Sequence, residues 1–165
     1  MSVIDELLSY NERYAESYRN AGLTARPKRG VAVVACKDAR IIIAKAFGLA
    51  EGDGHVIRNA GAVITDDIVR SLVISQHILG TKEIMVVAHT RCGMMTFTDD
   101  DLRERIRSSS GSDLAFPIGT FTDLEKHVST GVRKLRACEL LLHRDSIRGF
   151  VYDVDTGRAR EIHVS

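Results

Sequence analysis

The fold of this chain is decided by a stretch that reads Val31-Ala32-Val33-Val34-Ala35-Cys36-Lys37-Asp38-Ala39-Arg40. Its first five residues are a continuous apolar run, which is typical of a strand buried on both faces of a parallel sheet. A second stretch repeats the arrangement, since the apolar residues 84–88 are followed by His89-Thr90-Arg91-Cys92-Gly93. Ligand sites of open α/β sheets lie beyond the carboxyl ends of the strands, so the two polar stretches are predicted to meet at one sheet edge.

The side chains delivered to this edge are those of a metal site. Two thiolates and one neutral imidazole, from Cys36, Cys92 and His89, are a usual donor set for zinc, and three protein ligands keep a fourth position for water or substrate. Cys36, Asp38 and Arg40 alternate by two, so an extended chain points them the same way. His89 and Cys92 share a face if the chain turns helically. The sequence therefore predicts one Zn²⁺ per chain, with a carboxylate and a cation beside it.

Three short blocks carry a resemblance to a known family. They read Cys36-x-Asp38-x-Arg40, then Arg58-Asn59-Ala60-Gly61, then His89-Thr90-x-Cys92-Gly93. Their residues and order resemble the signature of the β-class carbonic anhydrases of the short bacterial type. The resemblance extends from about Val31 to the end of the chain, with residues 149–153 as the last strand. It implies a zinc lyase, a carbonate dehydratase, that converts CO2 and water reversibly to bicarbonate and a proton.

In that reaction zinc-bound hydroxide attacks CO2, and the neighbouring residues take defined roles. Asp38 is suited to orient the hydroxide, and Arg40 keeps Asp38 ionised. The resemblance further implies a closed state in which Asp38 becomes a conditional fourth zinc ligand. Because two thiolates neutralise the metal charge, we expect activity to rise on the alkaline side of neutrality.

Other residues of the blocks are expected to brace the site or to modify it. Arg58, Asn59, Gly61 and Gly93 are interpreted as bracing residues. Two positions depart from the family pattern, where Lys37 replaces a small or apolar residue and Arg91 an acidic one. They are either solvated surface charges or cleft-lining cations that attract anions.

The pattern of elements predicts an α/β fold in a single domain over residues 1–165. A helical arm is expected at residues 1–22 and a catalytic core at residues 30–165, with a central, mainly parallel four-stranded sheet, flanking helices and a possible antiparallel edge strand. Helices are expected at residues 3–20, 41–47, 65–78, 98–107 and 121–143, with a polar, flexible loop at 108–119 and a strand and hairpin at 149–163. Cys138 is interpreted as a core thiol.

The N-terminal helix has an unusually aromatic stripe that includes Tyr10, Tyr14 and Tyr18. The stripe packs either on its own domain or on a partner, since tyrosine is enriched at interfaces. The resemblance implies the second, a homodimer or a higher homo-oligomer.

Composition excludes several classes of protein. With 23 basic and 22 acidic residues and a net charge of +1, no nucleic-acid partner is expected. Three cysteines do not suit a disulfide framework, and the first residues lack the features of a signal peptide. No apolar run approaches the roughly 18 residues of a membrane span. A cytoplasmic protein without a membrane partner is expected.

Alternatives remain for the site. A related zinc enzyme that hydrolyses another small linear substrate, such as carbonyl sulfide, needs the same nucleophile, and Met94, Met95 and Phe97 form either an apolar pocket for it or plain core. A non-catalytic zinc-binding module would keep Asp38 on the metal permanently. A redox pair of Cys36 and Cys92 is disfavoured because neither lies in a C-x-x-C motif. The sequence does not place a proton-shuttling histidine near the metal.

Overall fold

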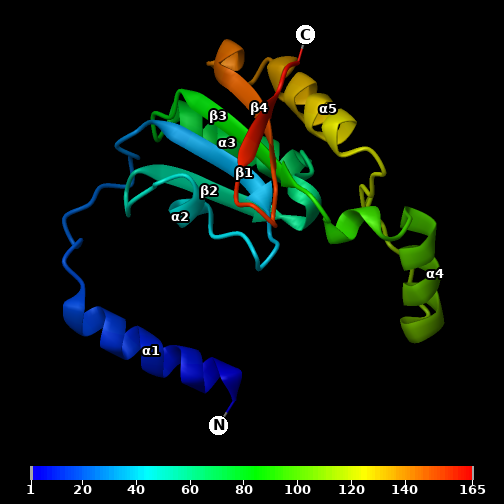
Figure 1. Cartoon of the computed structure of the whole chain (residues 1–165), viewed down its shortest axis with the longest axis horizontal. Helices are drawn as coiled ribbons and strands as arrows, with labels where there is room; N and C mark the ends of the chain where they lie inside the picture. The colour runs from blue at the N-terminus through cyan, green and yellow to red at the C-terminus, as the bar shows by residue number, and fades with distance from the viewer. Residues whose placement is uncertain (1, 165) are drawn as a thin grey trace.

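A computed structural model describes residues 2–164, so Met1 and Ser165 lie outside the described residues. Its centre is a five-stranded sheet in the order β2-β1-β3-β4-β5 (Figure 1). The strands are β1 (Val31–Cys36), β2 (Gly54–Asn59), β3 (Glu83–His89), β4 (Ile147–Tyr152) and β5 (Ala159–Ile162). The first four are parallel, and β5 pairs with β4 in the antiparallel direction. The predicted fold class, with its antiparallel edge strand, is confirmed.

The register of the strands aligns the two stretches that the sequence singles out. Ala35 of β1 pairs with Val87 of β3, so Cys36 and His89 end neighbouring strands at the same edge of the sheet. Cys36 also pairs with Asn59, the last residue of β2. The ends of three parallel strands thus lie side by side.

Helices cover both faces of the sheet because β1 and β3 are apolar on both sides. One face packs on α3 (Asp66–His77) and α5 (Leu124–Arg136), and the other on α2 (Ile43–Ala46) and its surroundings. The packing of α5 on β4 is close, since a Cβ on Gly149 would lie 2.5 Å from Val128 Cγ1. Across residues 2–164, no helix combines the length and the apolar character that a bilayer span requires.

The expected helix over residues 121–143 is wrong at its C-terminal end. The helix α5 ends at Arg136, and the chain then turns back toward β4. The apolar spacing continues to Leu142, but Leu142 is exposed and Leu141 is buried in its place. The N–H of Leu142 donates to the side chain of Gln76, a tertiary contact that overrides the helical pattern. Cys138 packs against the core, as predicted.

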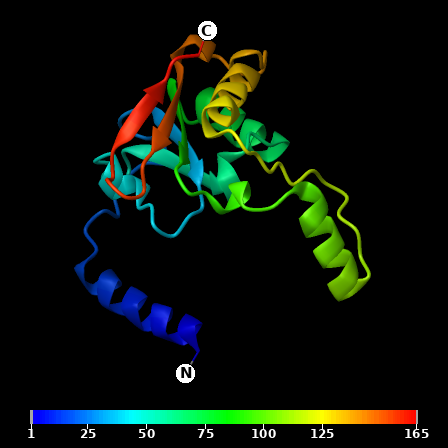
Figure 2. The same cartoon turned by 45° about the vertical axis from the view of Figure 1, so that its right-hand side comes forward.

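Two helices leave the body of the molecule. The helix α1 (Val3–Ser17) has no buried residue, and Figure 2 shows both α1 and α4 (Asp99–Ser110) extending away from the sheet. The interpretation of α1 as packed on its own domain is therefore wrong. Leu7 and Tyr14 are 62% and 49% exposed, because the linker through residues 18–30 carries the helix clear of the core.

The loop expected to be flexible, residues 108–119, is tied to α4. The helix runs three residues beyond its expected end, and Arg103 donates to the carbonyls of Leu114 and Phe116. The carboxylate of Asp99 accepts from the backbone N–H groups of residues 118–120. These bonds return the chain to the sheet edge.

Candidate metal centre

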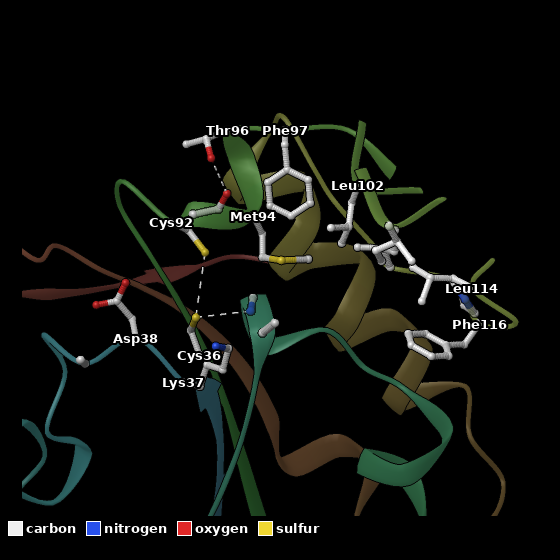
Figure 3. A pocket seen from close by; sticks show the side chains of 17 residues that line it. Cys36, Lys37, Asp38, Cys92, Met94, Thr96, Phe97, Leu102, Leu114 and Phe116 are labelled. Atoms are coloured by element: carbon white, nitrogen blue, oxygen red, sulfur yellow. Dashed lines mark hydrogen bonds between the residues drawn. The ribbon is translucent and has the colours of Figure 1, made fainter. Parts of the chain in front are cut away.

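Three side chains converge where β1 and β3 end. Cys36, His89 and Cys92, here called the ligand cluster, each offer one ligand atom, and these atoms all lie within 4.8 Å of one another. The two sulfurs are 3.9 Å apart (Figure 3). All three residues are buried, with His89 fully so. The parallel register supplies Cys36 and His89, and the turn after β3 brings Cys92 back to them.

The imidazole of His89 is held in the tautomer that a metal needs. Its Nδ1 lies 2.9 Å from the carbonyl oxygen of Thr90, and because a carbonyl can only accept, Nδ1 carries the proton. The Nε2 atom is buried and lacks a hydrogen-bond partner among residues 2–164. A buried polar atom without a partner is costly. An unpaired nitrogen beside two sulfurs fits a divalent cation such as zinc.

The two thiols are electrostatically coupled. The hydrogen bond with Cys92 is the main cause that lowers the pKa of Cys36 to about 4, and the N–H of Gly61 contributes. The same bond raises the pKa of Cys92. The opposite shifts make the Cys36 thiol the easier of the two to ionise, and a divalent cation would favour the thiolate form of both, since metals bind the thiolate.

Asp38 and Arg40 form a bidentate ion pair next to the cluster. Arg40 Nε and Nη2 each lie 2.8 Å from one carboxylate oxygen, and Nη2 also donates to the Arg91 carbonyl. The hydrogen bonds from Arg40 lower the pKa of Asp38 well below its usual range. Asp38 Oδ2 lies 3.7 Å from His89 Nε2. An ionised carboxylate is thus fixed beside the unpaired ligand nitrogen.

The predicted bracing residues differ in what they touch. Arg58 donates to the carbonyls of Cys36 and Asp38, at 2.9 and 2.7 Å. The N–H of Gly61 lies 3.3 Å from the sulfur of Cys36. Asn59 instead closes its own turn through two bonds to Val63.

Gly93 has a more local contact. Its carbonyl accepts from the hydroxyl of Thr96 in the turn after Cys92. Arg58 and Gly61 therefore contact Cys36 directly, Asn59 shapes a neighbouring turn, and Gly93 both shapes a turn and lines the cavity beside the cluster.

A cavity of about 830 Å³ opens beside the cluster. Cys36, Asp38 and Cys92 lie at one end of it (Figure 3). The rest of the wall is mostly apolar and includes Met94, Phe97, Leu102, Ile106, Leu114, Phe116, Pro117 and Ile118. Of the residues proposed as a pocket from the sequence, Met94 and Phe97 line the cavity, and Met95 is absent from its wall.

Sequence reasoning missed the wall that comes from α4 and residues 114–118. A signal was present, because Leu102 and Ile106 are four residues apart on one face of a helix. The two residues that depart from the family pattern, Lys37 and Arg91, lie in different surroundings. Lys37 lines the cavity, whereas Arg91 points to the surface and pairs with Asp155.

The histidines that the sequence could not place lie outside this cavity wall. His55 lies at the start of β2, where its Nδ1 is 2.7 Å from the hydroxyl of Ser75. His77 Nε2 lies 2.9 Å from the carbonyl of Leu140, and His127 Nε2 lies 2.8 Å from that of Gly61.

Comparisons with known proteins agree with these features. The family model described as carbonic anhydrase matches residues 31–114. Beta-carbonic anhydrase 1 of Mycobacterium tuberculosis is 41% identical over 162 residues, which are 98% of this chain and 99% of that protein. A carbon disulfide hydrolase of Acidianus sp. is 31% identical over 96% of this chain and 90% of its own.

Solved structures give the same result. A carbonic anhydrase from Streptococcus mutans superimposes with a TM-score of 0.94 at 42% identity, covering 99% of both chains. A carbonic anhydrase from Glaciozyma antarctica gives a TM-score of 0.89 at 37% identity, over 99% of this chain and all of the other.

Proposed function

Because this chain belongs to the β-carbonic anhydrase family, we propose that it catalyses the reversible hydration of CO2 to bicarbonate and a proton. We propose Cys36, His89 and Cys92 as the ligands of one Zn²⁺. The observation that carries the proposal is the convergence of three ligand atoms within 4.8 Å, with the imidazole nitrogen left unpaired.

The residues around the cluster have distinct tasks in this reaction. When bound, zinc supplies a Lewis acid that lowers the pKa of water and so provides a nucleophile near neutral pH. Asp38 accepts a hydrogen bond from the attacking water and aims its lone pair at the substrate. Arg40 holds Asp38 ionised and oriented. The apolar wall of the cavity admits CO2, and Lys37 at its lining attracts the bicarbonate anion.

The ion pair of Asp38 and Arg40 allows a second state of the site. If the bond between Asp38 and Arg40 breaks, Asp38 can turn toward the cluster and occupy the fourth ligand position, which closes the site. The 3.7 Å distance between Asp38 Oδ2 and His89 Nε2 supports this movement, because the carboxylate has little distance to cover. The ion pair between Asp38 and Arg40 supports an open resting state. A non-catalytic module with Asp38 permanently on the metal does not suit this pairing.

We also propose a homodimer or higher homo-oligomer with α1 in the interface. Seven exposed apolar or aromatic residues along the arm support it, namely Val3, Ile4, Leu7, Leu8, Tyr10, Tyr14 and Tyr18. Residues 1–22 would then act as the arm and residues 30–165 as the catalytic core of one domain. A cytoplasmic location is proposed from the three free cysteines, since a reducing compartment preserves thiols.

The test is stopped-flow CO2 hydration from about pH 6 to 9, with zinc measured on the same preparation. We expect stoichiometric zinc and a rate that rises on the alkaline side of neutrality. A protein that binds no zinc, or that binds zinc without hydrating CO2, would refute the proposal.

A second candidate reaction is the hydrolysis of carbonyl sulfide or carbon disulfide. It is favoured by the mostly apolar cavity wall beside the cluster and by the carbon disulfide hydrolases among the relatives. Both substrates are linear and apolar, and water attacks the same central carbon. Release of sulfide, measured against CO2 hydration on one enzyme sample, decides which substrate the cavity prefers.

A further inference from the structure

His127 of α5 reaches the sheet edge without touching the ligand cluster. Its ring stacks on Phe121 with a centroid distance of 3.8 Å and an interplanar angle of 6°. Its Nε2 lies 2.8 Å from the carbonyl oxygen of Gly61, so Nε2 carries the proton. Burial lowers the pKa of His127, which favours the neutral ring at physiological pH. The stacked, neutral imidazole is therefore a fixed donor to Gly61.

Gly61 connects this donor to the candidate metal ligand. Its carbonyl accepts from His127, while its own N–H donates to the sulfur of Cys36 at 3.3 Å. One residue thus receives a hydrogen bond from α5 and gives one to the end of β1.

The turn around Gly61 needs such support. Gly61 and Ala62 have φ angles of +76° and +54°. The left-handed region is unfavourable for alanine, and it persists where the surroundings enforce it. The space is also tight, because a Cβ on Gly61 would lie 3.0 Å from Met94 Cγ and 3.1 Å from Phe121 Cε1. The direction of the Gly61 N–H depends on how this strained turn is held.

We propose that His127 is a positioning residue of the metal site, which fixes the Gly61 turn so that its N–H donates to the Cys36 sulfur. The proposal rests on the zinc site proposed above. A hydrogen bond to a thiolate withdraws electron density from the sulfur and holds it in place. Partners of this kind tune a metal through its ligands.

The decisive variants separate the donor from the stacking ring. His127→Phe keeps an aromatic ring against Phe121 but removes the N–H, whereas His127→Gln keeps an amide N–H at a similar reach. His77 provides a matched control, because its Nε2 also bonds a backbone carbonyl, that of Leu140, at 2.9 Å and away from the cluster.

The readouts are the affinity for Co²⁺ and Zn²⁺, measured by chelator competition, and the sulfur-to-cobalt charge-transfer band of the Co²⁺ protein. We expect His127→Phe to lose about 10-fold in metal affinity, the lower end of the usual effect of such partners. We expect its band to move to longer wavelength, because the sulfur becomes more electron-rich. His127→Gln should recover most of both, and His77→Phe should change neither.

Unchanged metal affinity and an unchanged charge-transfer band in His127→Phe would overturn the inference. An equal effect of His77→Phe would also overturn it, as would a His127→Gln variant that recovers neither the affinity nor the band. A wild-type protein that binds no Co²⁺ or Zn²⁺ refutes the proposed function instead. If His127→Phe does not fold, the wild type loaded with ¹¹³Cd gives the answer. A scalar coupling between the Gly61 amide proton and the metal supports the inference, and its absence overturns it.

Discussion

The ligand cluster and the helix α1 have opposite surroundings. The cluster is enclosed at the sheet edge, whereas α1 is exposed. At the sheet edge, His89 is fully buried, and Arg40 holds Asp38 in a bidentate ion pair. On α1 no residue is buried, and a hydrogen bond from Tyr14 to Glu51 links the helix to the core. The comparison teaches that the chain encloses its own site but leaves the apolar and aromatic side chains of α1 exposed.

The largest expected effect comes from breaking the ligand cluster. Cys92→Ser should lose zinc and lower CO2 hydration by more than about 1,000-fold, because Lewis-acid stabilisation is worth several kcal/mol. Cys138→Ser is the control, since Cys138 packs against the core away from the cluster and should keep zinc and activity. Metal analysis with stopped-flow hydration checks both, and full zinc content in Cys92→Ser would contradict the assignment.

The second effect tests the carboxylate beside the cluster. Asp38→Asn keeps the shape of the side chain and all three ligands, so zinc should remain. Activity should fall about 100-fold, on the scale of removing one oriented group that stabilises a transition state. Equal zinc content with a lower kcat supports a role in orientation, whereas loss of zinc would assign Asp38 a role in metal binding.

The third effect tests whether α1 lies in an interface between subunits. Leu7→Glu adds a charge to a side chain that is 62% exposed in the single chain. In a monomer such a change is nearly neutral, within about 0.5 kcal/mol, but in an interface through α1 it buries a charge. We expect light scattering to show a fall toward the 18.2 kDa of one chain. Ser9→Glu on the same helix is the control, and an unchanged mass in Leu7→Glu places the interface elsewhere.

A smaller effect is expected at Asp99, which holds the segment that follows α4 and forms part of the cavity wall. Hydrogen bonds to Asp99, first the one from the hydroxyl of Thr120, lower the pKa of that carboxyl in the folded state. Its ionised form therefore stabilises the protein above the unfolded-state pKa of about 3.9, and this stability is lost as pH falls through the folded-state value.

Asp99→Asn should accordingly lower the Tm by roughly 2–4 °C at pH 7, the shift that about 1 kcal/mol produces at this chain length. The difference from wild type should shrink as the pH falls below 4. Asp100→Asn, next to it in the first turn of α4, is the control. A difference that is constant with pH would exclude the ionised carboxylate as its source.

The smallest effect is expected at Arg91, which pairs with Asp155 at the surface. Arg91→Asp should leave the hydration rate and its alkaline rise unchanged. The left-handed backbone of this residue, with φ of +53°, is one that aspartate tolerates. An alkaline rise displaced to higher pH would place Arg91 in the field of the metal after all.

Much of the fold follows from local patterns. The apolar runs before Cys36 and His89 mark buried parallel strands, and Thr65 and Thr98 begin α3 and α4 as N-caps. The same local reasoning fails at the end of α5, where the spacing continues past Arg136 but the contact between Leu142 and Gln76 turns the chain.

The candidate site was likewise predictable from the sequence only in part. Its ligand residues were predictable because parallel strands end at a common edge, so chemistry placed after each strand gathers there. The α4 wall of the cavity was only partly predictable, since the spacing of Leu102 and Ile106 marks an apolar face of a helix but does not indicate which surface that face meets. His127 was equally hidden, because its role depends on the carbonyl that it meets.

The sequence by itself determined the strands, their polar ends and the donor set, because these depend on residue type and short-range spacing. The tertiary structure alone decided the anchoring of Arg40 on the Arg91 carbonyl, the contact of His127 with Gly61 and the approach of the α4 wall to the ligand cluster. Each of these is set by contacts between residues far apart in the chain, such as the 51 positions that separate Arg40 from the Arg91 carbonyl it binds. Pairings over such separations are fixed when the whole sheet closes, and local sequence carries no record of them.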